Sequence, residues 1–590
     1  MKADATSFTF LGNAGVVKIP FFQRGYVWNQ ENWEDIWREL LDKTRNHFLG
    51  SIILKQQEVQ TNKVREVLVI DGQQRLTTLS ILLKALYDSF QEDTQKNCEN
   101  AIRGYLFYKE QQTDSDYYVK IEHSRLDSPS YKKVIENKLS SDECQKIDKS
   151  YPLILQCYKY FLDSANSINI KDRIELFNRL LNPENKILVL IDLAEKDDEQ
   201  TIFDTINSAG VRLSCADIIK NALFQQAIKL INKQADVIAM YKTNWEDIFA
   251  KDDDALTFWS TSRPTGRLMR DNIEILLHSI AVIKNFFDPD KHTLSDLSAL
   301  YKKQIMGFNK NELIELITDI GNYGNLYRDK MLVFNKSTIF SYDDNAQRLF
   351  HILDECEIST FHPYILELYK KHAKSPQILD DELKKIEKFI MRQMITKGET
   401  KSYNKLCKEF LGNSASIDAK VSEISDSEVK GGLQSITNKN AALILFWVEL
   451  YRRHLDSKQA IKELKYNYSL EHIMPQKWEQ YWSIITVPVK DDHGSIIVDP
   501  IKASEERYKK VYCIGNMTLL NSSLNTSLRN YEFKKKVEGD GKKKGIKSYA
   551  DLSITKEDII VPFDSGNNVW DESNINDRTS KIAKEVLSLW

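Results

Sequence analysis

The chain has 590 residues, of which 42% are hydrophobic and 28% charged, with a formal net charge of -3 at pH 7. This length exceeds what one hydrophobic core usually supports, and no apolar run approaches the ~20 residues that cross a bilayer, so the composition indicates a soluble multidomain protein and excludes a membrane-spanning one. The charge excludes a uniformly basic nucleic-acid binder. No secretory signal is visible, and the cysteines lie singly without a CxxC pair, so we expect a cytoplasmic protein without disulfides or a zinc site.

The predicted elements change in type along the chain. Up to about residue 230, the strand-like runs VVKIP, SIILKQ, REVLVI and KILVLIDL alternate with helical stretches such as RLTTLSILLKAL. From about 231 to 410 the pattern is almost wholly helical, and the Ser- and acid-rich stretch 412–432 indicates an exposed linker or long loop. We therefore predict a predominantly helical α+β chain with an α/β domain at 1–230, a helical connector with a linker at 231–432, and a final domain at 433–590.

The stretch IDGQQRLTTLS, residues 70–80, places an acid, a glycine, two amides and an arginine between a predicted strand and a predicted helix. A turn at a helix start presents backbone N–H groups and the positive end of the helix dipole, which suits a phosphate. Gly72 lets the backbone come close, Arg75 can fork onto a phosphoryl oxygen, and Gln73 and Gln74 can hydrogen-bond a nucleotide or water. Asp71 fits this site if it holds a divalent cation or orients water. The alternative is a plain turn whose amides cap the helix.

A second group of polar residues lies in the C-terminal region. His472 follows an apolar stretch in SLEHIMPQ, Asn516 lies in VYCIGNMTLL, which is predicted as a strand, and Asn525 lies on a predicted helix, NTSLRNYEFKKK. A strand, a strand and a helix bearing such residues are the parts of a ββα-metal nuclease site, where a base activates water and a cation neutralises the phosphate. A lone histidine is usually structural, and that remains the alternative for His472.

The region 501–550 has 12 Lys and Arg residues against 5 Asp and Glu residues. A run of charges is normally a solvated face, but beside a nuclease motif we expect contacts with the DNA phosphate backbone. The lysines predicted to make these contacts are Lys534, Lys535, Lys536, Lys542, Lys543 and Lys544.

Several motifs together resemble the GmrSD-type modification-dependent (type IV) restriction endonucleases. In the first part of the chain these are FFQRGYVW, HFLGSIIL, VIDGQQRLTTL and FDTINSAGVRLSCADIIKN, in matching order. The resemblance implies a ParB- and sulfiredoxin-like domain that binds and hydrolyses an NTP. The nucleotide site it implies consists of Asp71, Gly72, Gln73, Gln74 and Arg75, with Arg24 as a second phosphate contact and Asn207, Gly210, Asp217 and Lys220 as weaker candidates.

At the C-terminal end the resemblance rests on H-I-x-P at 472–475, G-N-x-T-L-L at 515–520, and the closing segment VWDESNINDRTSKIAKEVLSLW. It implies an HNH nuclease domain in which His472 is the general base and Asn516 orients its imidazole through a side-chain carbonyl. Asn525 is then a metal ligand, and Glu471 stands where many HNH relatives carry a metal-binding aspartate. An asparagine as the third letter of the HNH name favours Mg2+ or Mn2+ over zinc.

We therefore expect an NTP-regulated, divalent-metal-dependent DNA endonuclease that acts against phage, on modified phage DNA and without a membrane partner. One alternative is a nucleotide-switched, ParB-like DNA-binding regulator that does not cut, and another is a non-selective nuclease effector. The sequence does not choose among DNA modifications, NTPs or directions of nucleotide control, and it leaves assembly into a homo-oligomer open.

Overall fold

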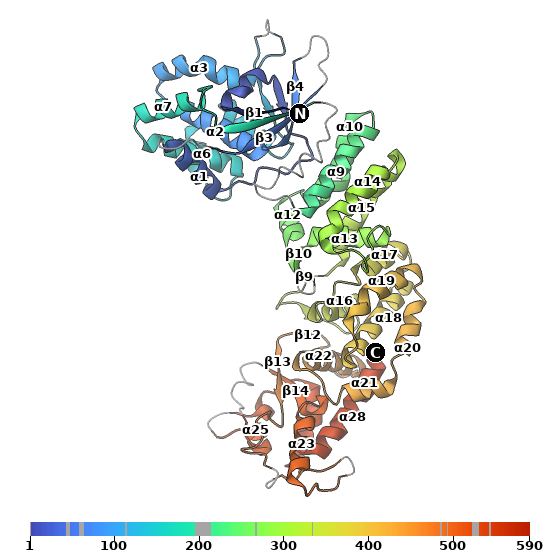
Figure 1. Cartoon of the computed structure of the whole chain (residues 1–590). Coiled ribbons are helices and arrows are strands. Elements are labelled where there is room, and N and C mark those ends of the chain that lie inside the picture. The colour runs from blue at the N-terminus through green and yellow to red at the C-terminus, as the bar shows by residue number, and fades with distance from the viewer. Residues whose placement is uncertain are drawn as a thin grey trace. The chain divides into compact units, whose positions relative to one another are not determined.

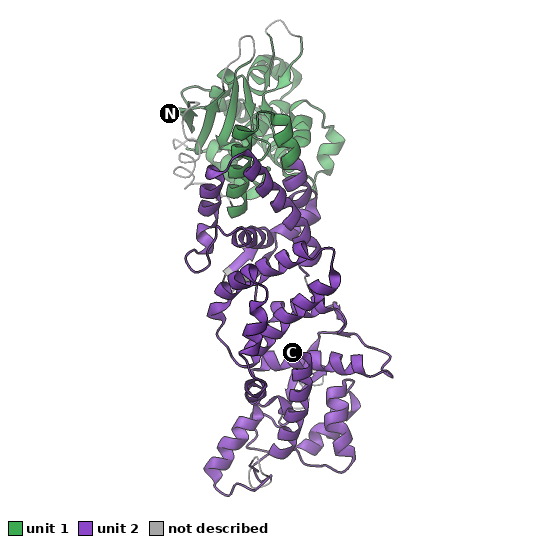
Figure 2. Cartoon of the chain, turned by 90° about the vertical axis from the view of Figure 1, so that its right-hand side faces the viewer, with its two compact units in different colours: residues 1–241 green, residues 242–590 purple. Residues whose placement is uncertain are grey.

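The computed structural model describes residues 2–42, 48–57, 64–111, 115–194, 214–265, 268–332, 334–483, 487–491, 494–521, 530–541 and 544–590. The chain divides into two compact units, an N-terminal unit of residues 1–241 and a C-terminal unit of residues 242–590 (Figure 1, Figure 2). The predicted α+β class with predominantly helical content is confirmed, while the threefold division at 230 and 432 stays a prediction. Across the described part of the chain, no helix is long and apolar enough to cross a membrane.

The N-terminal unit is built on a six-stranded mixed sheet with the order β1-β8-β3-β4-β2-β7 (Figure 1). Strand β3 runs parallel to β8 and antiparallel to β4, while β2 runs parallel to β4 and β7. The four strands predicted from apolar runs are all present. The bounds are β1 Lys2–Thr6, β2 Val16–Lys18, β3 Ser51–Gln56, β4 Glu66–Asp71, β7 Ile121–Glu122 and β8 Leu188–Leu193, with the separate pair β5 Phe107–Tyr108 and β6 Tyr118–Val119.

Helix α2, residues Gln73–Asp88, is the central helix of this unit and follows directly from β4. Leucines that recur at helical spacing in this stretch are fully buried in the main core of the unit, where α2 packs against α6: Leu76, Leu79, Leu82, Leu83 and Leu86. Because the helix is buried around most of its circumference, its first turn is held firmly at the C-terminal end of β4, an inner strand of the sheet. The other helices are α1 Gln30–Leu41, α3 Glu92–Leu106, α4 Ser128–Ile135, α5 Ser141–Lys146, α6 Leu153–Ser167, α7 Ile170–Leu180, α9 Cys215–Leu230 and α10 Gln234–Tyr241.

The C-terminal unit is mainly helical and carries short strand pairs. Its helices are α11 Asp247–Phe249, α12 Asp253–Ser260, α13 Asn272–Ile283, α14 Leu297–Gly307, α15 Lys310–Lys330, α16 Asn345–Glu355, α17 His362–Lys371, α18 Pro376–Ile395, α19 Tyr403–Gly412, α20 Ser416–Ser422, α21 Asp426–Gly432, α22 Asn438–Leu455, α23 Pro500–Val511, α25 Phe533–Glu538, α26 Ser553–Thr555, α27 Val561–Asp564 and α28 Glu572–Leu589. The strand pairs are β9 Ser262–Thr265 with β10 Leu268–Asp271, β11 Ile339–Phe340 with β12 Leu464–Lys465, and β13 Tyr468–His472 with β14 Met517–Asn521. A short 3-10 turn, η6 Ile514–Asn516, precedes β14.

The stretch 412–432 is not the loop or linker that its composition predicts. Helices α20 and α21 occupy most of it, and Ile417 and Val429 are buried. Ser425 and Glu428 form a capping box that starts α21, a local signal that the Ser- and acid-rich composition concealed. Gly432 marks close packing, because a Cβ atom there would come 2.2 Å from the carbonyl oxygen of Ile395.

Histidine burial makes the stability of the C-terminal unit sensitive to acid. His351 on α16 is 2% exposed and its Nδ1 accepts a hydrogen bond from Trp447 Nε1 at 3.2 Å. Burial lowers its pKa from the usual 6.5 to about 3. Between these values the unfolded chain binds a proton that the folded chain does not, so the free energy of unfolding falls as the pH falls.

We expect acidification from about pH 7.5 to about 5.5 to lower the free energy of unfolding by about 1.4 kcal/mol through His351 alone. Urea unfolding of the wild type and of His351→Leu at both pH values measures this contribution. The variant should be less stable at neutral pH because it loses the hydrogen bond to Trp447, but its pH dependence should be smaller by that amount. An equal pH dependence in the two proteins would contradict the assignment.

Candidate functional site

The DGQQR turn lies where β4 ends and α2 begins. Asp71 is the last residue of β4, and Gly72 is the N-cap of α2 with a φ of +88°. A Cβ atom at Gly72 would come 2.8 Å from the carbonyl oxygen of Ser51 and 3.0 Å from the Cα of Ile52. Glycine is therefore required here both by the left-handed backbone and by the close approach of β3. Since Gly72 has no side chain, it cannot cap the first turn of α2.

Gln74 binds the protein's own backbone. Its side chain is buried, its Oε1 accepts hydrogen bonds from the backbone nitrogens of Val27 and Trp28 at 2.9 and 3.3 Å, and its Nε2 donates to the carbonyl of Gly25 at 3.0 Å. These bonds use Oε1 twice and one of the two N–H groups of Nε2, so the predicted contact of Gln74 with a nucleotide stays a prediction. The residue attaches the FFQRGYVW motif to the DGQQR turn.

Gln73 and Arg24 form the second attachment between these motifs. Gln73 Nε2 donates to the carbonyl of Arg24 at 2.7 Å, while Gln73 Oε1 is buried without a hydrogen-bond partner among the described residues. Burial alone would raise the pKa of Asp217 on α9, but Lys220, the Ser214 hydroxyl and the charge of Arg24 bring it below its usual value. Lys220 is buried and donates to Asp217 Oδ1 at 2.8 Å. The structure thus places Arg24 beside the turn and within electrostatic reach of Asp217.

The HFLGSIIL motif reaches the same turn through Arg75. Arg75 Nη1 donates to the carbonyl of Ser51 at 2.9 Å, and a Cβ atom at Gly50 would come 2.5 Å from Arg75 Nε. Gly50, with a φ of +111°, is a residue that sequence reasoning did not single out, although its place just before a strand was visible. Asp71 is half-buried, and no described residue offers its carboxylate a hydrogen bond or an ion pair. Three motifs therefore meet at one turn that contains a carboxylate without a partner.

The candidate nuclease site is formed by the β13–β14 pair. These strands are antiparallel, with His472 opposite Met517 and Glu471 opposite Thr518. His472 Nε2 is buried and has no hydrogen-bond partner in the described part of the chain. Burial, together with the nearby charge of Lys536, lowers the pKa of His472 to about 4. The imidazole is therefore neutral near pH 7 and can accept a proton.

Asn516 has a different role from the predicted one. It belongs to η6 rather than to the strand, and it is fully buried. Its Oδ1 accepts hydrogen bonds from the backbone nitrogen of Met474 at 2.8 Å and from Trp570 Nε1 at 3.1 Å. Its Nδ2 donates to the carbonyls of Met474 and Val511 at 2.9 and 3.0 Å. The prediction that its carbonyl orients the imidazole is wrong, because Asn516 fixes the backbone just after His472 instead.

Helix α28 supports the turn that contains Asn516. A Cβ atom at Gly515 would come 2.2 Å from the carbonyl oxygen of Ile575, so only glycine fits against this helix. The backbone nitrogen of Gly515 donates to Thr579 Oγ1 at 3.1 Å, and Arg578 Nη1 donates to the carbonyl of Gly515 at 2.8 Å. The tryptophan and arginine of the closing segment, Trp570 and Arg578, therefore act by holding the turn beside the candidate base.

Lys536 and Glu471 form an ion pair next to the backbone of His472. Lys536 on α25 is fully buried, and its Nζ bonds the Glu471 carboxylate and the carbonyl of His472, the latter at 2.7 Å. The predicted DNA contact by Lys536 is wrong, because its position on α25 turns it to the buried face beside Phe533 and Val537. Glu471 is likewise already neutralised, so a divalent cation at this carboxylate would lie next to an ammonium group.

The other predicted DNA and metal residues fall into two groups. Lys534 and Lys544 are exposed, and the Lys535 ammonium lies 4.1 Å from the centre of the Tyr531 ring, so these lysines can meet a polyanion. Asn207, Gly210, Asn525, Lys542 and Lys543 lie outside the described residues. Among the residues that the structure describes, no three His, Cys, Asp or Glu side chains gather as a metal site would need.

Lys536 and Lys534 give a matched pair of variants on the same helix. We expect Lys536→Met to lower the free energy of unfolding by about 3–5 kcal/mol, because Glu471 would be left buried without its partner. Lys534→Met, at an exposed position, should change it by less than about 0.5 kcal/mol. Urea unfolding of both variants checks the difference. Similar small effects would show that the ion pair does not stabilise the fold.

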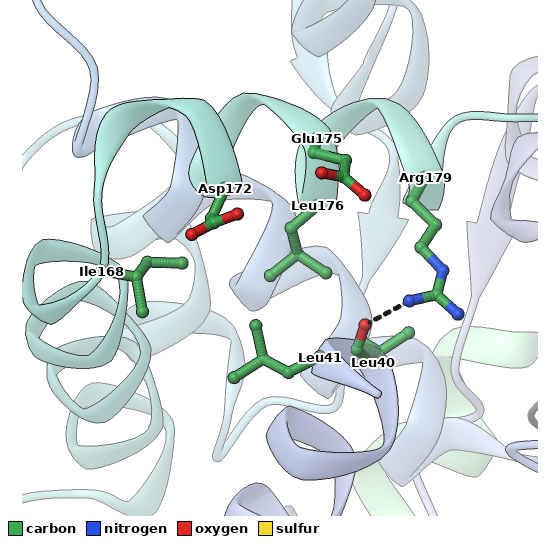
Figure 3. A pocket seen from close by; sticks show the side chains of 7 residues that line it. All are labelled: Leu40, Leu41, Ile168, Asp172, Glu175, Leu176 and Arg179. Atoms are coloured by element: carbon green, nitrogen blue, oxygen red, sulfur yellow. Dashed lines mark hydrogen bonds between the residues drawn. The ribbon is translucent and has the colours of Figure 1, made fainter. Parts of the chain in front are cut away.

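A cavity of about 170 Å3 in the N-terminal unit lies apart from the DGQQR turn. It is lined by residues of α1 and α7, among them Leu40, Leu176 and Arg179, and Arg179 Nη1 donates to the carbonyl of Leu40 at 2.8 Å (Figure 3). Asp172 and Glu175 point toward it from α7 (Figure 3). None of these residues belongs to the motifs discussed above.

Comparison with known proteins identifies the family of the chain. The family described as GmrSD restriction endonuclease, N-terminal domain, matches residues 8–224, and the GmrSD restriction endonucleases, C-terminal domain, match residues 423–585. An uncharacterised protein of Methanocaldococcus jannaschii is 25% identical over 255 residues, which are 38% of this chain and 41% of that protein. The two family matches together cover more than half of the chain and include the DGQQR turn and the His472 site. The chain therefore belongs to the GmrSD restriction endonuclease family.

Proposed function

We propose that this protein is a DNA endonuclease of phage defence, in which His472 acts as the general base. The observation that carries the proposal is the buried Nε2 of a neutral imidazole at the end of β13, which has no hydrogen-bond partner in the part of the chain that the structure describes. In the reaction this nitrogen takes a proton from water, the water oxygen forms a bond to phosphorus, and the bond from phosphorus to the leaving oxygen breaks. Asn516 and the ion pair of Lys536 with Glu471 hold the backbone of His472 in place.

A divalent cation commonly neutralises the charge of the scissile phosphate in such reactions. The role of such a cation here is a proposal to be tested, and Asn525 is the proposed ligand among the predicted residues. The ββα-metal HNH fold is part of the same proposal. In this proposal the β13–β14 pair corresponds to its two strands and α25 belongs to its helix, and the antiparallel pairing of these strands supports it.

We also propose that the DGQQR turn binds an NTP in a ParB- and sulfiredoxin-like domain and controls cleavage through it. The uncapped first turn of α2, the close backbone at Gly72 and the positions of Arg24 and Arg75 suit the phosphates. Among the described residues, the Asp71 carboxylate and Gln73 Oε1 are both acceptors without partners, so they suit a cation or a water that accompanies the nucleotide.

A nucleotide-switched DNA-binding regulator is the second candidate. The pairing of Glu471 with Lys536 favours it, because this pairing removes one carboxylate from any metal site. A non-selective nuclease effector is the third candidate. It would cut plain and modified DNA equally, whereas the preferred function cuts modified DNA.

One assay separates the three functions. The purified protein is incubated with plain duplex DNA and with duplex carrying glucosylated 5-hydroxymethylcytosine, each with Mg2+, Mn2+ or EDTA, and with or without each NTP. We expect metal-dependent cutting that prefers the modified duplex and changes with NTP. DNA that is bound but never cut identifies the regulator, and equal cutting of both duplexes identifies the non-selective nuclease.

A further inference from the structure

A cavity of about 660 Å3 opens in the C-terminal unit beside α23. Tyr508, Lys509 and Tyr512 line it from the end of that helix, Gln434 lines it from the segment between α21 and α22, and Asn576 lines it from α28. Its volume lies within the range of about 300–1000 Å3 that is usual for ligand sites. The candidate functions described so far do not use it.

The floor of the cavity is formed by tightly packed backbone. The backbone nitrogen of Ile436 donates to the carbonyl of Tyr512 at 3.2 Å, and that of Ile514 donates to the carbonyl of Leu433 at 3.0 Å. Leu433, Ile436 and Ile514 are buried. The cavity therefore rests on packed backbone, and this arrangement suits a site that must distinguish one ligand from another.

Two tyrosines form an aromatic surface in the cavity. The rings of Tyr508 and Tyr512 meet edge to face with centroids 5.5 Å apart, and Tyr508 is 59% exposed. The centroid of the Tyr512 ring lies 6.1 Å from the centroid of the His472 imidazole. An exposed aromatic ring of this kind is a platform on which a nucleic-acid base can stack. Tyr512 therefore both lines the cavity and lies beside His472, the candidate general base.

The charged groups of the cavity match a nucleotide. Lys509 has a largely exposed side chain 3.5 Å from Glu506, while the buried Lys510 bonds Asn576 Oδ1 at 2.8 Å and lies 3.4 Å from Glu506. The exposed ammonium group of Lys509 can attract a phosphate, and the Glu506 carboxylate can accept hydrogen bonds from the exocyclic amino group of a base. An apolar ligand would not need aromatic, cationic and hydrogen-bond-acceptor groups in one cavity. This combination therefore suits a nucleotide.

We propose that this cavity receives a single nucleotide of the DNA substrate that has swung out of the duplex, with its base stacked on Tyr508. The inference rests on the proposed nuclease function and adds the recognition of substrate to it. A base inside a duplex hides most of its surface, whereas an extruded base can be inspected on all sides. The cavity is large enough for a base with an added substituent, so it is the place where the protein tells modified DNA from plain DNA.

Photochemical cross-linking tests the position of the base. Duplex DNA with 5-iodo-2′-deoxycytidine in place of cytosine is bound to the full-length protein and irradiated, and the cross-linked peptides are identified by mass spectrometry. We expect a cross-link to Tyr508 or Tyr512 that disappears from position 508 in Tyr508→Ala. This readout requires DNA binding but not cleavage, so it separates the cavity from the nuclease function. Bound DNA without cross-links in residues 506–513 would overturn the proposal.

The second readout compares two exposed tyrosines of the same unit. Loss of a stacking surface commonly weakens binding of a base on the order of tenfold to hundredfold, and we expect Tyr508→Ala to lower cleavage of modified duplex by this factor. Tyr549→Ala removes a tyrosine that is 51% exposed and does not line the cavity, so it should cut like the wild type. Equal cutting by the two variants would overturn the cavity proposal while leaving the nuclease intact. A wild type that binds DNA but never cuts it would instead overturn the nuclease proposal, and the cross-link would then decide the cavity alone.

Discussion

Replacing His472 with alanine is expected to abolish DNA cleavage while DNA binding and NTP hydrolysis persist. The substitution removes a buried imidazole that is neutral near pH 7 and whose Nε2 has no hydrogen-bond partner among the described residues. Loss of a general base commonly lowers a rate by about 10² to 10⁴. The backbone at this position should stay in place, because two hydrogen bonds hold it without using the imidazole. The backbone nitrogen of Ile473 donates to the carbonyl of Asn516 at 2.9 Å, and Lys536 Nζ donates to the carbonyl of His472.

Cleavage of modified duplex by His472→Ala is measured beside DNA binding and thermal unfolding. His372→Ala is the matched control, since it removes a half-buried histidine at the end of α17, away from the β13–β14 pair. The control should cut like the wild type. Cleavage by His472→Ala within about threefold of the wild type would exclude general-base catalysis by this residue, since the expected loss is about 10² or more.

The second large effect is expected at the DGQQR turn, where Asp71→Ala should abolish NTP hydrolysis. Its carboxylate ends β4 and has no partner among the described residues, so its removal takes away a group that can place a cation or water and breaks no internal bond. The fold should persist, because the leucines that pack α2 are untouched. Phosphate release and calorimetric titration with each NTP measure hydrolysis and binding separately.

Two further variants sharpen this result. Glu66→Gln alters an acid at the opposite end of the same strand, where Glu66 pairs with Lys18 at 2.7 Å, and it should hydrolyse NTP normally. Arg75→Ala should mainly weaken NTP binding, but it also breaks the hydrogen bond to the carbonyl of Ser51, so its thermal unfolding must be compared with that of Asp71→Ala. Normal hydrolysis by Asp71→Ala would mean that the turn only starts a helix.

The same variants test whether the nucleotide controls the nuclease. Asp71 lies in the N-terminal unit and His472 in the C-terminal unit, so a nucleotide can alter cleavage only by binding two arrangements of the chain with different affinity. We therefore expect Asp71→Ala to change DNA cleavage although the His472 site is intact. Cleavage that responds to NTP equally in the wild type and in Asp71→Ala would show that control does not pass through this turn.

Much of the local structure follows from the sequence. The leucines from Leu76 to Leu86 recur with the period of a helix, the apolar runs before them read as strands, and the polar turn between the two contains Asp71 and Gly72. These signals depend on neighbours along the chain, so α2, β4 and their junction were predictable. The same holds for the order of motifs that identifies the family, because a motif match needs no knowledge of contacts.

The roles of individual polar side chains depended on the tertiary structure. The run of three lysines at 534–536 indicates one charged patch on the surface. Lys536 is nevertheless buried beside the backbone of His472, because its position on α25 faces the core. The sequence suggests Gln74 as a nucleotide ligand and Asn516 as a partner of the imidazole, yet Gln74 bonds backbone groups near residue 27, and Asn516 bonds the backbone of Met474 and the side chain of Trp570. Hydrogen-bond partners are set by which segments the fold brings together, and composition carries no record of that.

The sequence by itself determined the α+β class, the position of the turn before α2 and the family. Only the tertiary structure decided that Gly50 makes room for Arg75, that Gly515 lets α28 approach, and that Tyr508 and Tyr512 line a cavity next to His472. Each of these is a contact between residues that are far apart along the chain, or on a helix face that only packing selects. Periodicity and turn chemistry act within a few residues, whereas packing and the pairing of buried polar groups act across the whole folded unit.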